Sequence, residues 1–248
     1  AYIPATEWAA EVDEWHASTR ISTLHVESRE VNAVLKSILT GYLMDMWFDV
    51  VSSKVKLSAI SVWKESSRQL IEGKEINART AKKSAQPTIR ASKALVLYDK
   101  KDLTLGDDVA SFNKGSQYQD DRLVSPALYS THKDKAFEPN QFLSKDAADL
   151  LVQRYVSRFK FTPYIRSWVT DERNINFKTG DVVDIVSTVD QAPDGSSGNA
   201  RGQITKINPK YGKAGRTYNV TAMTYEAAFS DNSEILVSAP LSETSLYV

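Results

Sequence analysis

The chain has 248 residues, of which 42% are hydrophobic and 25% charged, a composition typical of a globular protein long enough to bury a sizeable core. Its 31 basic and 31 acidic residues cancel, which argues against a strongly basic nucleic-acid-binding protein but leaves room for a local basic patch. The absence of cysteine excludes disulfides and cysteine-based zinc sites, and the absence of a run of about 18 apolar residues excludes a transmembrane helix.

The N-terminal segment predicts a short helix. It lacks the basic and then apolar stretches of a signal peptide. Thr6 is placed to cap a helix that ends at His16, and Trp8, Val12 and Trp15 fall on one face of it. Residues 21–26 then alternate briefly in the way of a strand.

A second helix is predicted over residues 28–40. Ser28 is placed to cap it, and Gly41 suits its C-terminal stop. The apolar residues between them recur with helical spacing and predict a stripe that faces the core: Val31, Val34, Leu35, Ile38 and Leu39.

A hairpin is predicted over residues 43–60, because the apolar period changes from helical to two after Gly41. One face of the first strand carries Met44, Met46, Phe48 and Val50. Residues 51–53 turn the chain into a second alternating run that contains Val55 and Leu57. Together with the preceding helix, this hairpin indicates an α+β unit.

The middle of the chain gives fewer signals. Residues 65–87 are polar with scattered lysine and arginine, and Arg90 to Tyr98 is a strand candidate. Lys100 to Asn140 contains Gly106, Gly115 and two prolines, so we expect an irregular excursion there.

A third helix is predicted after Ser144, which is placed to cap it. Asp146 lies in the first turn, where the helix dipole favours a carboxylate, and Thr162-Pro163 ends the helix. Its expected buried stripe is Ala147, Leu150, Leu151, Tyr155 and Phe159.

The last third of the sequence predicts a β-meander. A short strand at 164–169 is followed by a turn at Lys178-Thr179-Gly180-Asp181 and by strands that begin near Val182, Gln203 and Thr217. Gly- and Pro-bearing loops at 194–198 and 208–216 separate these strands. Strands joined in this way are typical of a small antiparallel barrel or sandwich.

The predicted fold class is therefore α+β, with a small antiparallel β-barrel or sandwich and an α+β part that contains two amphipathic helices. We expect three parts: 1–90, with the helix 28–40 and the hairpin 43–60; 91–143, with a strand and the irregular excursion; and 144–248, with a helix and the meander. The chain lacks an initiator methionine and ends on the apolar Leu246-Tyr247-Val248, so we expect it to be an ordered piece of a longer protein.

No catalytic, cofactor or metal motif stands out. His16, His25 and His132 lie far apart, without the spacing of metal ligands, so we expect structural or surface histidines. The pairs Asp107-Asp108 and Asp120-Asp121 lack the alternating spacing of a calcium loop and are expected to be solvated. The sequence therefore predicts no enzyme and no cofactor, and a Ser-His-Asp site assembled from distant residues has no signal in it.

Two alternatives stay open. A carbohydrate-active domain would use Asp120 or Asp121 as a catalytic carboxylate. A β-rich nucleic-acid-binding module would use the strongest basic cluster, which flanks Tyr211 and Tyr218 and could form a cationic groove with stacking rings. That cluster consists of Lys206, Lys210, Lys213 and Arg216. A solvated hairpin loop is the favoured interpretation of this cluster, because no second basic stripe joins it in the sequence.

The order of the elements resembles one protein family. A Trp-bearing opening segment precedes the helix at 31–39, the run Met44-Asp45-Met46-Trp47-Phe48-Asp49 and the strand Ala94 to Tyr98. The helix 147–159, Gly180-Asp181-Val182-Val183 and Tyr218 to Tyr225 follow. This succession, over roughly residues 1–225, resembles the hub or central tail-tip proteins of long-tailed bacteriophages.

The resemblance implies a structural virion protein at the phage tail tip. Hubs of this family form a homotrimer whose β-barrel domains make a ring that continues the tail tube, with a lumen on the route of the DNA during ejection. The implied partners are the tail tube, distal tail, tape-measure and fibre proteins, and the implied location is the virion, with the host cytoplasm during assembly. The family has no catalytic residues in this part, and residues 100–140 have no counterpart that we can match.

Overall fold

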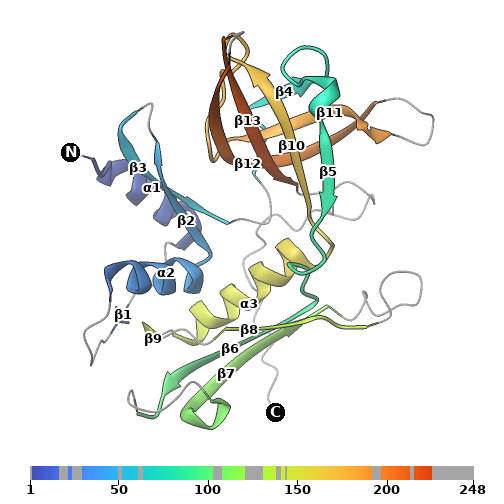
Figure 1. Ribbon diagram of the computed structural model, residues 1–248. Helices are drawn as coiled ribbons and strands as arrows, with labels where there is room; N and C mark the ends of the chain where they lie inside the picture. The colour runs from blue at the N-terminus through green and yellow to red at the C-terminus, as the bar shows by residue number, and fades with distance from the viewer. Residues whose placement is uncertain are drawn as a thin grey trace.

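The chain folds into three groups of elements, and Figure 1 shows the long helix α3, which belongs to the second group, in the middle of the molecule. The computed structural model describes residues 2–16, 22–23, 30–49, 52–60, 64–102, 108–120, 131–137, 141–142, 144–191, 197–212 and 215–224. Helices and strands are mixed within these ranges, and most of the regular structure is sheet. The predicted α+β class is confirmed.

The first group is an N-terminal unit of two helices and a hairpin. Its elements are α1 (Ala5–His16), α2 (Val31–Gly41), β2 (Met44–Asp49) and β3 (Lys54–Ala59), with β2 antiparallel to β3. The Trp8 indole Nε1 donates to the Val55 carbonyl of β3 over 2.9 Å and ties α1 to the hairpin. The predicted helix–strand–turn–strand order is confirmed. Helix α1 begins at Ala5, so Thr6 lies inside the first turn instead of capping it.

Helix α2 differs from its prediction in detail. Ser28 lies outside the described residues, and the N-cap position is held by Glu30 without a side-chain hydrogen bond. Of the five residues of the expected apolar stripe, Ile38 and Leu39 pack against the core, whereas Val31 is 71% exposed. Gly41 is the last helical residue, but the left-handed backbone that ends the helix belongs to Leu43, with φ of 50°.

The second group packs α3 (Lys145–Phe159) on a three-stranded sheet of order β7–β6–β8. Its strands are β6 (Lys93–Lys100), β7 (Phe112–Gln119) and β8 (Asp134–Phe137), with β7 antiparallel and β8 parallel to β6. The expectation of an irregular excursion from Lys100 to Asn140 is wrong for β7 and β8. Neither strand shows a clear apolar alternation, and pairing with the buried β6 is what organises them.

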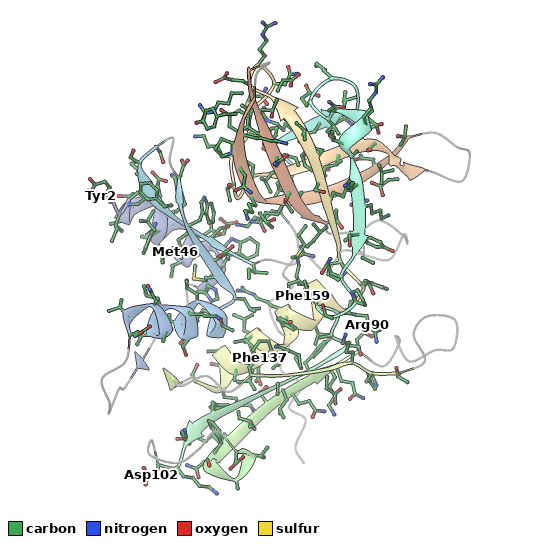
Figure 2. All side chains as sticks on the ribbon, in the orientation of Figure 1. Tyr2, Met46, Arg90, Asp102, Phe137 and Phe159 are labelled. Carbon is green, nitrogen blue, oxygen red and sulfur yellow. The ribbon has the colours of Figure 1, made fainter. Side chains whose placement is uncertain are left out.

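Helix α3 is the best-predicted element. Its N-cap is Ser144, whose hydroxyl accepts from the Ala147 amide over 3.2 Å, as the sequence predicts. The buried face is broader than the predicted stripe, because it also includes Ala148, Val152 and Val156. Figure 2 shows Phe137 and Phe159 where the helix meets the sheet. The Tyr155 ring centroid lies 4.8 Å from each of these rings, edge to face with Phe137 and tilted against Phe159.

The third group is a six-stranded sheet of order β4–β11–β12–β13–β10–β5. The strands are β4 (Arg68–Ile71), β5 (Lys82–Ala85), β10 (Tyr164–Asp171), β11 (Val182–Gln191), β12 (Ser197–Gly212) and β13 (Gly215–Thr224). The predicted meander is confirmed, but the polar stretch 65–87 also contributes both edge strands. Residues 68–85 therefore belong to this sheet, although the sequence groups them with the N-terminal part. The predicted loop at 208–216 is largely β-structure, since β12 and β13 pair as far as Gly212 and Gly215.

This sheet curls around its own core (Figure 1). Buried side chains from five strands meet in one cluster on its concave face: Leu70, Trp168, Ile185, Ile204 and Val220. Within the described residues no hydrogen-bonded ladder joins the edge strands β4 and β5. The sequence predicts a small antiparallel barrel or sandwich. The structure shows a strongly curved and mostly antiparallel sheet, with β4 parallel to β11, and its described residues form no closed barrel.

Short remaining elements complete the chain. The strand β1 (Ser22–Thr23) pairs with β9 (Gln141–Phe142), and the 3-10 turns η1 (Ala78–Thr80) and η2 (Val109–Ser111) precede β5 and β7. In the sequence, the helix–sheet group is inserted between β5 and β10, which are neighbouring strands of the curved sheet. Ala85 at the end of β5 pairs with Tyr164 at the start of β10, and the Gln86 amide donates to the Pro163 carbonyl over 2.9 Å.

Candidate functional site

The β12–β13 hairpin carries the basic cluster that the sequence singles out. Residues that pair across adjacent strands share a face of the sheet. Arg216 pairs with Tyr211 in the same orientation as the core residue Val220, so both lie on the concave side. Lys210 pairs with Thr217 and therefore points to the opposite, outer side.

Arg216 is engaged by its neighbours on the concave side. Its guanidinium carbon lies 5.3 Å from the Tyr211 ring centroid and 5.0 Å from that of Tyr218. Its Nη1 is 3.8 Å from Oε1 of Glu172. Arg216 therefore lies against the two rings that a nucleic-acid site would need for base stacking, although Tyr211 remains 74% exposed.

Lys206 and Lys210 remain together on the outer face, whereas Lys213 lies outside the described residues. Lys206 pairs with Thr221, and both lysines are exposed. The structure therefore brings together two of the four predicted residues and separates Arg216 from them. The spacing of Lys206, Asn208 and Lys210 already indicates that the two lysines share a face, because alternate residues of a strand point the same way.

A lysine that the sequence analysis missed joins this face through β5. Lys82 pairs with Ser167 of β10, and Ser167 pairs with Thr221 of β13. One row across four strands thus has the order Lys206, Thr221, Ser167, Lys82. The outer lysine face is our name for the residues of this row and of the next two rows that face the same way, toward the β12–β13 turn. The neighbouring rows contain Asn208, Asn219 and Val169, then Lys210, Thr217 and Asp171.

A buried ion cluster lies on the concave side of the same sheet. The Arg166 Nε donates to Asp190 over 2.5 Å, and Lys83 Nζ donates to the other carboxylate oxygen over 2.8 Å. Both Arg166 and Asp190 side chains are less than 10% exposed. Burial alone would raise the pKa of Asp190, but the hydrogen bonds from Arg166 and Lys83 outweigh it and hold that pKa below its usual value. The cluster joins β10, β11 and β5, and its role is structural.

His16 is a buried histidine at the junction of α1, α2 and α3. Its ring meets Tyr42 edge to face at 5.8 Å, and both residues line a cavity of about 10 Å³ together with Arg154. This is about the space of one water molecule. Burial and the nearby Arg154 charge lower the pKa of His16 to about 4. The prediction of a structural histidine fits this position.

His132 lies beside a serine, but not in a catalytic arrangement. Its Nδ1 is 3.3 Å from the Ser92 hydroxyl, which also accepts from the Lys133 amide over 2.9 Å. Ser92 has no exposed surface, so a substrate cannot reach it. His25 lies outside the described residues.

The acidic pairs do not form an open carboxylate site in the described structure. Asp120 is 6% exposed and lies 3.4 Å from Lys160, while Asp108 is exposed at the N-cap position of η2. Their sequence neighbours Asp107 and Asp121 lie outside the described residues. Among the described residues no group of histidine and carboxylate side chains is arranged to hold a metal ion. Nor does this part of the chain contain a helix long and apolar enough to cross a membrane.

Comparisons with known proteins give matches among solved structures. No protein-family model and no curated protein sequence matches the chain. A chain in the virion of a native gene transfer agent particle is 14% identical with a TM-score of 0.52, over 81% of this chain. The 43 kDa tail protein of prophage MuSo2 from Shewanella oneidensis (12% identity, TM-score 0.48) matches 82%, and a tail protein from Neisseria meningitidis MC58 (10% identity, TM-score 0.46) matches 81%.

The match to the gene transfer agent virion shows a shared fold. It confirms, at the level of the fold, the resemblance to a virion component that the order of elements predicts. The chain spans 40% of the length of that virion protein and 56% of each of the two tail proteins.

Proposed function

We propose that this chain is a non-enzymatic structural protein of a phage-type tail, a hub or tail-tip component that assembles as a homotrimer. The observation that carries the proposal is the fold shared with a gene transfer agent virion chain over 81% of the residues. Three copies of the chain, each with its six-stranded and its three-stranded sheet, would form a ring of pseudo-sixfold appearance. That ring would continue the tail tube around the path of the DNA.

The architecture suits assembly better than catalysis. The curved sheet ends in two short edge strands, β4 and β5, whose outer edges have no ladder partner among the described residues. Such edges are surfaces on which copies of a chain can pair. The cavity beside His16 is too small for a substrate, with about 10 Å³. A protein that forms the wall of a tube needs surfaces that pack against and pair with its neighbours. The edges of β4 and β5 are the proposed pairing surfaces.

The proposed partners follow from that role. They are a second and a third copy of the chain, the tail tube, distal tail, tape-measure and fibre proteins, and the DNA that passes during ejection. The proposed location is the virion, reached from the host cytoplasm during assembly, without stable membrane insertion.

The mass of the assembled protein tests the proposal. Light scattering coupled to size exclusion should give three times the monomer mass, and electron microscopy of the same fraction should show rings with a central opening. Antibody labelling of particles should locate the protein at the tail end. A stable monomer that is absent from particles would contradict the proposal.

A further inference from the structure

We propose that the outer lysine face of the curved sheet contacts the phosphodiester backbone of DNA, transiently and without regard to base sequence. The inference deepens the proposed tail role, on which it rests for its setting, because it names the surface that would meet the DNA in the lumen. It differs from the alternative considered from the sequence, a single basic loop from Lys206 to Arg216, because the face spans four strands.

The spacing of the three cations is fixed by the sheet. Lys206 and Lys82 are at the two ends of one row, three strand spacings apart, which is about 14 Å. Lys206 and Lys210 are four residues apart on β12, which is about 13 Å. Between the row ends lie the hydroxyls of Thr221 and Ser167. The face therefore offers spread positive charge with hydrogen-bond donors between the cations.

The three lysines of the outer lysine face differ from nearby basic residues in that no carboxylate in the described part of the chain neutralises their charge. Within the described residues Lys82, Lys206 and Lys210 form no ion pair, and Asp171 is the one carboxylate in the three rows. By contrast, a carboxylate lies against each of several nearby cations. These pairs are Lys83 with Asp190, Arg201 with Asp184 and Arg216 with Glu172. The positive charge on the outer face is thus left for an external anion.

The side chains between the lysines favour phosphate over a protein surface. Lysine, serine, threonine and asparagine are the usual donors to phosphate oxygens, and all four types occur in the three rows. The rows contain no aromatic residue to stack on a base or to anchor a protein interface. In Figure 1 no helix is drawn across β13, β10 and β5 at the front of the curved sheet. Three phosphate contacts predict weak binding that salt screens readily, as suits DNA in transit.

The test compares two triple variants of the full chain with equal charge. Lys82→Gln, Lys206→Gln and Lys210→Gln remove the proposed face, while Lys36→Gln, Lys145→Gln and Lys178→Gln remove three other exposed lysines. Anisotropy of labelled duplex DNA at low salt should show binding that weakens about tenfold or more in the first variant and little in the second. The slope of log affinity against log salt should fall by about 2–3 in the first variant.

Three results would overturn the inference: no binding of duplex DNA at low salt, equal loss in both triple variants, or tighter binding of polyglutamate through the same three lysines, which would assign the face to an acidic protein. Incorporation into particles is measured separately. Lysine-dependent DNA binding by a protein that is absent from particles would refute the tail role and leave the DNA contact standing. Incorporation into particles without any DNA binding would refute the DNA contact and leave the tail role standing.

Discussion

The indole of Trp47 in β2 packs directly against Gly180, the glycine of the turn that leads into β11. A Cβ atom on Gly180 would lie 2.5 Å from two carbons of the indole ring. Gly180 also has a φ of +93°, in the left-handed region that favours glycine. One residue of the N-terminal hairpin thus relies on a glycine of the curved sheet, and this contact joins two groups of elements.

We expect Gly180→Ala to lower the free energy of unfolding by about 2–4 kcal/mol, because the substitution adds left-handed strain to a clash with Trp47. Urea unfolding followed by tryptophan fluorescence would measure the loss. Gly73→Ala is the matched control, since Gly73 has a φ of +87° with nothing within 4 Å of its would-be Cβ. The control should lose about 1 kcal/mol. Equal losses at the two glycines would mean that the indole contact costs nothing.

The burial of His16 predicts an acid-sensitive stability. Its pKa is about 4 in the folded protein and 6.5 without burial, so the unfolded chain binds the extra proton first. Above about pH 6.5, the buried neutral His16 therefore contributes about 3 kcal/mol to the free energy of unfolding. This contribution decreases as the pH is lowered and is lost below about pH 4. Thermal unfolding of His16→Gln should therefore depend less on pH over this window than the unmodified chain. His132→Gln is the control, and an identical pH profile for His16→Gln and the unmodified chain would contradict the assignment.

Loss of the Asp190 carboxylate should be costly, because Arg166 would remain buried without its counter-ion. We expect Asp190→Asn to destabilise the fold by about 3–5 kcal/mol. Asp184→Asn, which removes the more exposed partner of Arg201, should cost about 1 kcal/mol or less. Chemical unfolding of the two variants makes the comparison. Similar small effects would show that the concave ion cluster contributes little.

The N-cap of α3 offers a local test. Ser144→Ala removes the acceptor for the Ala147 amide and should cost about 1 kcal/mol. Ser144→Asp supplies another acceptor and should retain the stability, aided by its charge at the helix N-terminus. Circular dichroism during thermal unfolding would separate these variants. A loss with aspartate as large as with alanine would argue against capping.

The sequence predicts elements well where local chemistry and burial agree. Helix α3 has a capping serine, a dipole-compatible Asp146 and an apolar face, and each signal points to the same boundaries. The β2–β3 hairpin has a clean period of two. The edge strands β4 and β5 have four residues each, and β5 is a polar Lys82 to Ala85 run with low strand propensity. Pairing with β11 and β10, distant in sequence, is what makes them strands.

The candidate site was only partly predictable for the same reason. The cluster from Lys206 to Arg216 is contiguous in sequence, but strand alternation sends Lys210 outward and Arg216 inward. The shared face of Lys206 and Lys210 follows from the period of two within β12, whereas the opposite face of Arg216 depends on how β12 pairs with β13. The addition of Lys82 could not be inferred from the sequence, because it depends on β5 pairing with β10 across about 80 intervening residues.

The pairing of Ala85 with Tyr164 marks the point at which one segment is inserted into the curved sheet. Everything from Gln86 to Pro163 departs from and returns to a single point of the curved sheet, where two adjacent chain ends could be bridged by a tight turn. Excising that segment would leave the strand order of the sheet intact. The inserted segment can therefore be exchanged or change in length without a change in the strand register of the curved sheet.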